Sequence, residues 1–233
     1  MTQVQSHNSF PIALSFLEVA SSICSIVVVT WGIVPLKPGA MWLRLIPFLL
    51  IFIQSSTSQI LRGETLKEIG LTAHHLAVAS KLLIPPTLIS TGLLLLIGVI
   101  YGQVPQGIGF LIDLPALLLS GMVQQYLLQG FIHRRIDFAI HNILKNDSLF
   151  RSTLPIFLTA LTFSLVHLPN VVLTALTFLA GLIWAAIYKR APSIYALGVS
   201  HGLMSLVAIN TLPPRLLHSL SVGYKHFLYQ SYP

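Results

Sequence analysis

The sequence predicts an all-α membrane protein, a polytopic bundle of about seven transmembrane helices. Hydrophobic residues make up 55% of its 233 residues and charged residues only 8%, and the mean hydropathy is +0.82. A soluble domain needs far less apolar sequence than this. The apolar residues also gather in runs of about 20, which is the length of a helix that crosses a bilayer. We therefore expect a single integral membrane domain over residues 1–233, with no separate soluble domain.

Seven apolar runs, separated by short polar loops, predict the spans. Prolines, glycines and charged residues bound the runs and favour turns there. Pro85 and Pro86 predict a kink or a late helix start near the beginning of the third run. The polar residues 62–76 predict a short interfacial helix whose charges form a solvated face. The runs cover approximately residues 12–36, 41–60, 82–101, 108–133, 154–168, 171–188 and 194–212.

The charge pattern favours the lipid bilayer as the partner of the basic residues and argues against nucleic acid. The net charge is +7 and the pI is about 9.8, but Lys and Arg lie in the loops between apolar runs and do not form one basic face. The first ten residues contain no Lys or Arg, so we expect no cleaved signal peptide. Cys24 is the single cysteine, which excludes an internal disulfide.

Lys and Arg are distributed unequally between the two sides that seven spans would create. An excess of these residues marks the cytoplasmic side, so the distribution predicts a cytoplasmic N-terminus. One side holds Lys37, Arg44, Arg215 and Lys225, whereas the side of the N-terminus holds Arg62, Lys67, Lys81, Arg134, Arg135, Lys145, Arg151, Lys189 and Arg190.

Three polar side chains interrupt the fourth run at helical spacing. Gln125, Gln129 and His133 stand four residues apart and so form one stripe on a helix, and Gln124 lies about 100° round from Gln125. An amide without a partner in lipid costs a few kcal/mol, so the stripe should face the bundle interior or a wet cavity. Such residues often serve only as hydrogen bonds between helices. Two later polar islands favour a functional interpretation, because each places a histidine in an apolar run.

Taken in order, these islands resemble the motifs of the CPBP (Abi) family of intramembrane proteases, over residues 108–212. The first family motif reads E-E-x-x-x-R, and here Gln124, Gln125 and Gln129 occupy its positions. The second, F-x-x-x-H, is matched by Phe163 and His167, followed by the common Leu-Pro-Asn extension that ends at Asn170. The third is matched by His201, with Ser205 where Asn is usual.

The resemblance implies a membrane peptidase of the type II CAAX prenyl endopeptidase or bacteriocin-processing kind. In that family a motif-one glutamate and two histidines activate water, and the implied candidates here are Gln124, Gln125, His167 and His201 as catalytic residues. Gln129, Phe163, Asn170 and Ser205 are the implied binding or structural residues. A divalent metal such as zinc would be held by His167 and His201. The implied partner is a membrane-borne or lipidated peptide.

The departures from the motif bear directly on the chemistry. Glutamine keeps the shape of glutamate but cannot take a proton from water, and it is a poor metal ligand. Loss of a general base typically costs 10²–10⁴-fold in rate. Because two acids and one base have all become Gln, the replacement leaves no unpaired buried charge.

Other residues are candidates for the missing base. Asp113 lies about 16 Å along the helix from Gln124, which is too far. Glu18 lies inside the first span, where an acid is a functional candidate, and either histidine could act as the base itself. His133, Asp137 and His141 continue the stripe and would suit a metal site, although a solvated helix face is the more common outcome of such spacing.

Three functions remain open from the sequence. The first is an intramembrane endopeptidase with reduced or altered activity that uses His167 and His201. The second is a pseudoprotease that binds membrane segments or lipidated peptides without cutting them, as an adaptor or immunity factor. The third, a small transporter, would need a polar path through the first three spans, which contain little beyond Glu18.

Overall fold

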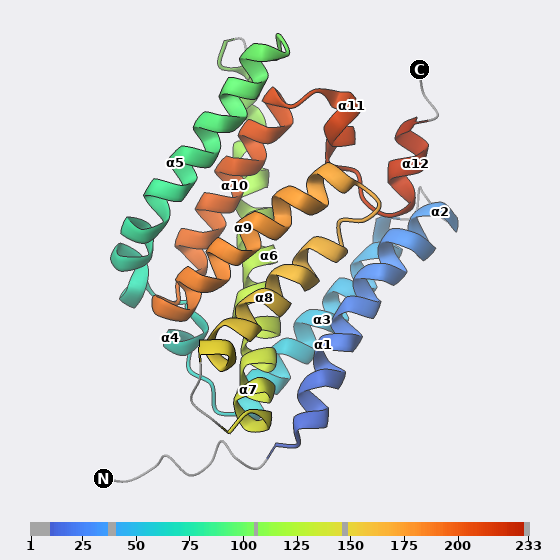
Figure 1. Ribbon diagram of the computed structural model, residues 1–233. Helices are drawn as coiled ribbons and strands as arrows, with labels where there is room; N and C mark the ends of the chain where they lie inside the picture. Colours follow the sequence, from blue (N-terminus) through green and yellow to red (C-terminus); the bar gives the residue numbers. More distant parts are fainter. Residues whose placement is uncertain (1–9, 37–40, 105–106, 146–148, 231–233) are drawn as a thin grey trace.

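The computed structural model describes residues 10–36, 41–104, 107–145 and 149–230, and these residues form helices with no strand (Figure 1). The predicted all-α fold is confirmed. In chain order the elements are α1 (Ile12–Val27), η2 (Val28–Ile33), α2 (Val34–Leu36), α3 (Met41–Leu61), α4 (Leu66–Ile69), η3 (Ala73–His75), α5 (Leu76–Ile100), η4 (Gly109–Asp113), α6 (Leu114–Gln125), η5 (Tyr126–His133), α7 (Arg134–Ile143), α8 (Leu149–Leu165), α9 (Val171–Arg190), α10 (Ile194–Thr211), α11 (Pro214–Leu217), η6 (His218–Leu220) and α12 (Tyr224–Gln230).

Six helical segments within the described residues are long and apolar enough to cross a membrane. They are Ile12–Leu36, Trp42–Leu61, Ala73–Ile100, Gly109–Ile143, Val171–Arg190 and Ile194–Thr211. The fifth predicted span corresponds to α8, an apolar helix of 17 residues. Helix α1 begins at the opposite end of the bundle from α12 (Figure 1). The protein is therefore an integral membrane protein.

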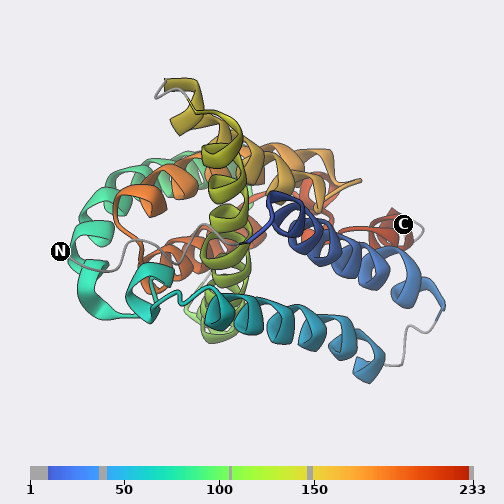
Figure 2. The same ribbon diagram turned by 90° about the horizontal axis from the view of Figure 1, so that it is seen from below.

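The helix formed by α6, η5 and α7 runs through the middle of the bundle. It has α1 and α3 on one side and α5 and α10 on the other (Figure 2). Glycines allow α6 and α10 to cross closely, because a Cβ on Gly198 would lie 2.8 Å from the Cα of Met122. This crossing sets Gln125 of α6 beside His201 of α10.

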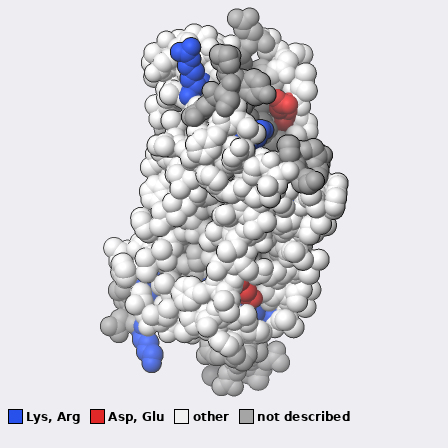
Figure 3. Space-filling view, turned by 90° about the vertical axis from the view of Figure 1, so that its right-hand side faces the viewer, with Lys and Arg blue, Asp and Glu red and all other residues white. Residues whose placement is uncertain are grey.

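The surface of the bundle agrees with a membrane location. In the face that Figure 3 shows, a broad central band carries no charged side chain, and the visible Lys, Arg, Asp and Glu side chains lie toward the two ends. Large apolar side chains such as Ile60, Ile100 and Leu119 are mostly exposed. In a bilayer these residues would face lipid.

The prolines of the third span do not delay its start, so the prediction of a late helix start is wrong. Helix α5 begins at Leu76 and continues through Pro85 and Pro86 to Ile100. Each proline removes only its own backbone hydrogen bond. In lipid the rest of the helix must keep its bonds internal, which favours continuing the helix through the prolines.

The polar segment after α3 also differs from the prediction. Two short helices, α4 and η3, replace one interfacial helix. Lys67 and Glu68 are exposed as predicted, but Arg62 is only 6% exposed and is not part of a solvated face.

The helix of the fourth span continues beyond residues 133–135 as α7, to Ile143. Arg135, near the start of α7, is only 1% exposed, because the carboxylates of Glu18 and Glu64 pair with it.

Candidate functional site

His167 stands directly after α8, in the turn that leads to α9. Its Nδ1 lies 2.6 Å from the carbonyl oxygen of Phe163, one helical turn earlier. A carbonyl only accepts hydrogen bonds, so Nδ1 of His167 must carry the proton. The Nε2 of a neutral His167 is then an unprotonated acceptor.

His201 lies in the middle of α10 and is buried between aromatic rings. Trp184 of α9 stacks on it with ring centroids 4.7 Å apart, and the edge of Phe163 packs against it at 5.8 Å. The ring of Phe163 also contacts His167 at 4.8 Å. The ring of Phe163 therefore contacts both histidines.

Gln125 is the polar partner of His201. Its Nε2 lies 3.3 Å from Nδ1 of His201, and its side chain is fully buried. An amide nitrogen only donates, so Nδ1 of His201 accepts and its Nε2 carries the proton. The two histidines therefore present opposite groups, a donor on His201 and an acceptor on His167. The Oε1 of Gln125 is buried and accepts no hydrogen bond from a described residue.

The predicted polar stripe is buried, but it does not form one site. Residues Tyr126–His133 form a π-helix, whose backbone hydrogen bonds run from residue i to i+5 instead of i+4, so the stripe changes direction. Gln129 is fully buried, and neither amide atom has a partner among the described residues. His133 turns toward α8 and α9, where Thr159 lies 2.9 Å from its Nδ1 and Tyr188 packs against its ring.

The remaining motif residues lie at the periphery of the histidine pair. Gln124 is half-buried and donates to Ser120 on its own helix. Ser205 is half-buried one turn after His201 on α10.

Asn170 has a structural position. It caps α9 by accepting from the N–H of Leu173, and it donates to the carbonyls of Leu217 and Ser221. It thereby ties the C-terminal segment to the turn that carries His167.

No described acid stands beside the two histidines. Asp113 is exposed at the start of α6. The described residues contain no group of three or more His, Cys, Asp and Glu that could hold a metal ion. A catalytic zinc site normally has three protein ligands, so two histidines and neutral amides do not fit a divalent metal. Asp137 pairs with Lys189 at 3.0 Å, and His141 lies 3.5 Å from it, as on a partly solvated face.

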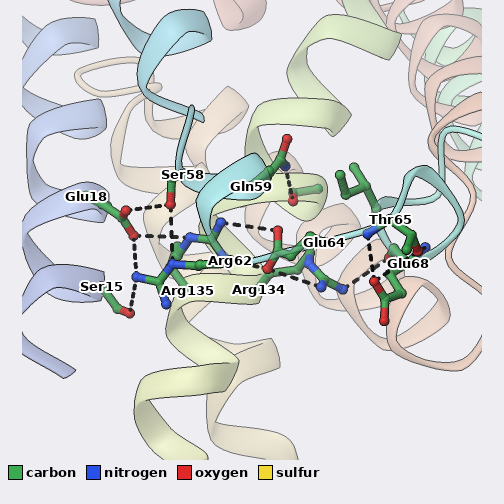
Figure 4. Close-up of polar contacts among 12 residues, drawn as sticks. Ser15, Glu18, Ser58, Gln59, Arg62, Glu64, Thr65, Glu68, Arg134 and Arg135 are labelled. Carbon is green, nitrogen blue, oxygen red and sulfur yellow. Dashed lines mark hydrogen bonds and ion pairs between the residues drawn. The ribbon is translucent and has the colours of Figure 1, made fainter. Parts of the chain in front are cut away.

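Glu18, the sequence's other candidate base, belongs to a separate buried cluster that Figure 4 shows. Its carboxylate binds Arg62 at 3.0 Å and Arg135 at 3.1 Å and accepts from Ser58. Glu64 continues the row, because it binds Arg135 at 2.6 Å and Arg134 at 3.1 Å. The buried ion pairs among the described residues thus join α1, the end of α3 and the start of α7, and do not involve the histidine pair.

The sequence analysis missed this cluster and the ring of Trp184. The sequence did contain a signal for this cluster: Glu18 lies in one span and Arg135 at the end of another, and buried opposite charges on different helices are expected to pair. No pattern in the sequence distinguishes Trp184 from an ordinary lipid-facing aromatic residue.

Comparison with known proteins supports the motif-based assignment. Residues 105–207 match the family model described as type II CAAX prenyl endopeptidase Rce1-like. This segment contains η5, both histidines, Phe163 and Trp184. The comparison with curated proteins gave no match, and the comparison with solved structures gave none either. The match over residues 105–207 supports membership of the CPBP family, which includes the type II CAAX prenyl endopeptidases.

Proposed function

We propose that the protein binds a membrane-borne or lipidated peptide segment at the His167–His201 pair and holds it without hydrolysing it. The observation that carries the proposal is the hydrogen bond between the Gln125 amide and His201. This amide stands at a motif position where the family has a glutamate. It keeps the histidine oriented but cannot accept a proton from water.

The opposite hydrogen-bonding groups of the two histidines support a peptide as the ligand. A peptide unit offers one C=O acceptor and one N–H donor. The C=O would accept from Nε2 of His201, and the N–H would donate to Nε2 of His167. The apolar wall formed by Phe163 and Trp184 would strengthen both hydrogen bonds by excluding water.

The test is binding of farnesylated and unmodified C-terminal peptides to the protein in nanodiscs. We expect saturable binding that weakens about three- to tenfold in His167→Ala and in His201→Ala, because each loses one hydrogen bond of ordinary strength. Leu179→Ala, at an exposed position of α9, is the matched control and should bind as the wild type does. Equal binding by all four proteins would refute the proposal.

A second function, slow hydrolysis with His167 as general base, is favoured by one observation. The proton of His167 is fixed on Nδ1 by the Phe163 carbonyl, which leaves Nε2 as a basic nitrogen. In that case Nε2 would take a proton from water, and the hydroxide would attack the peptide carbonyl. The formation of cleavage products distinguishes this function from binding alone.

A further inference from the structure

Two hydrogen bonds hold Trp184 against His201. The indole Nε1 of Trp184 on α9 donates to the hydroxyl of Ser200 on α10 at 3.1 Å. The hydroxyls of Ser200 and Thr87 share a second hydrogen bond at 2.7 Å, and Thr87 lies on α5. Helix α5 packs against both α9 and α10 (Figure 1). A polar link through three helices therefore ends at the ring that faces His201.

The ring of Trp184 is closely packed. Trp184 and Ser200 are 3% and 4% exposed, and Phe163 packs against Trp184 with ring centroids 6.0 Å apart. Trp184, Ser200 and Thr87 also line a cavity of about 10 Å³, which has room for about one water molecule and is far too small for an indole ring. The face of Trp184 therefore stays against His201, where the two ring planes differ by only 27°.

His201 has little else to fix the direction of its ring. The ring forms one hydrogen bond with a described residue, the contact from Gln125, and at 3.3 Å this bond is longer than usual. The last side-chain torsion of histidine is broad, so one long hydrogen bond leaves the ring plane loosely defined. An aromatic stack stabilises a ring about as much as one hydrogen bond does. The stack on Trp184 is therefore a second restraint on His201, comparable with the first.

We infer that Trp184 is a positioning residue for His201. With Ser200 and Thr87 to hold it, Trp184 fixes the ring plane and so the direction in which Nε2 of His201 donates. The inference rests on the proposed function, in which this donor binds a peptide carbonyl. The family motifs do not include Trp184 or Ser200, and Thr87 lies outside the matched residues 105–207. The third span, which contains none of the motif residues, thus contributes to the site.

The first experiment measures binding of a farnesylated peptide to the full-length protein in nanodiscs. Trp184→Leu keeps the site apolar but removes the ring face, and we expect it to weaken binding about two- to tenfold. Trp184→Phe restores a ring face and should bind more tightly than Trp184→Leu. Trp42→Leu, at a 64% exposed position of α3, is the matched control and should bind as the wild type does.

A double-mutant cycle separates positioning from packing. If Trp184 acts through His201, Trp184→Leu should change binding by less than about twofold when it is added to His201→Ala. A loss that is as large in this background as in the wild type would overturn the inference, because Trp184 would then act independently of His201.

The second experiment needs no peptide. Nitrogen nuclear magnetic resonance of protein with isotope-labelled histidine, with the His201 signals assigned through His201→Ala, reports which ring nitrogen carries the proton. We expect Nε2 to carry it in the wild type. Trp184→Leu should average the signals of the two nitrogens, because a ring that turns loses its bond to Gln125. Ser200→Ala and Thr87→Val should shift the signals in the same direction by smaller amounts.

The spectra distinguish the inference from the proposed function. Thr57→Val, at an exposed position of α3, is the control for Thr87→Val and should leave the His201 signals unchanged. Unchanged His201 signals in Trp184→Leu would overturn the inference, and unchanged signals in Ser200→Ala would do so even if Trp184→Leu does not fold. Peptide binding that fails in every protein would refute the proposed function, and the spectra alone would then support or overturn the positioning of His201.

Discussion

At the scale of single residues, the polar side chains inside this bundle are of two kinds. Gln125 and Gln129 are neutral and have amide atoms without partners among the described residues, whereas Glu18 and Arg135 are charged and form an ion pair. A neutral amide without a partner costs a few kcal/mol at most, but an unpaired charge costs far more. This difference explains why the histidine site contains amides while every buried carboxylate described here lies next to an arginine.

Glu18→Gln should strongly destabilise the protein, because it leaves Arg62 and Arg135 with a single carboxylate between them. We expect a loss of about 3–5 kcal/mol in the free energy of unfolding, measured by denaturation in detergent. Asp137→Asn breaks a pair whose side chains are 33% and 27% exposed and should cost about 1 kcal/mol or less. Equal losses in the two variants would contradict the burial of the cluster.

Glu64 predicts a specific pH dependence of stability. Burial alone would raise its pKa, but the hydrogen bond from Arg135 and the charges of Arg134 and Arg135 outweigh burial, so its pKa lies below the ordinary 4.5. A lowered pKa in the folded state contributes stability that is present above pH 4.5 and is lost as the pH falls through the folded pKa. The stability difference between wild type and Glu64→Gln should therefore be constant from pH 7 to pH 5 and shrink below pH 4.5. A difference that grows on acidification would be inconsistent with this pairing.

At the scale of elements, the crossing of α6 and α10 and the π-helix η5 determine the site. The crossing brings Gln125 to His201, and η5 then turns the next polar residues away from that histidine. Gln59 of α3 donates to the carbonyl of Gly130 within η5, which ties the first half of the chain to this irregular helix. Such π-helical insertions occur often at functional sites.

Gly198→Ala should disturb the site through this crossing. Its Cβ would lie 2.8–2.9 Å from backbone atoms of Met122, and the resulting strain should cost about 1–3 kcal/mol and weaken peptide binding. The control is Gly92→Ala on α5, where a Cβ would meet no described atom within 4 Å. This change should stabilise the helix by about 0.5–1 kcal/mol. Thermal unfolding and peptide binding by the two variants would check the prediction, and an unchanged Gly198→Ala would refute it.

At the scale of the whole molecule, α4 and α7 lie at the same end of the bundle as the start of α1 (Figure 1). The excess of Lys and Arg predicts that this end is cytoplasmic. A fluorescent protein fused to the N-terminus should then fluoresce, and alkaline phosphatase fused to the C-terminus should be active outside the cytoplasm. If alkaline phosphatase is instead active when fused to the N-terminus, and the fluorescent protein fluoresces when fused to the C-terminus, the orientation is the opposite of the predicted one.

Hydropathy was sufficient to predict the all-α membrane fold, and the order of three polar islands was sufficient to predict the family. The pairing of His201 with Gln125 agrees with the motif positions. The sequence could not give the partners of Glu18, because such partners depend on how α1, α3 and α7 pack. It also could not give the π-helix, which rotates His133 toward Thr159, or the course of α5 through Pro85, where the cost of leaving backbone groups unsatisfied in lipid outweighs local preference.

The most direct test of the central claim is a cleavage measurement on peptide already bound to the wild-type protein in nanodiscs, with His167→Ala in parallel. We predict that the bound peptide stays intact in both proteins, because no carboxylate of the described residues stands beside the histidines. Products that form with the wild type and disappear in His167→Ala would contradict the claim and establish hydrolysis with a histidine base.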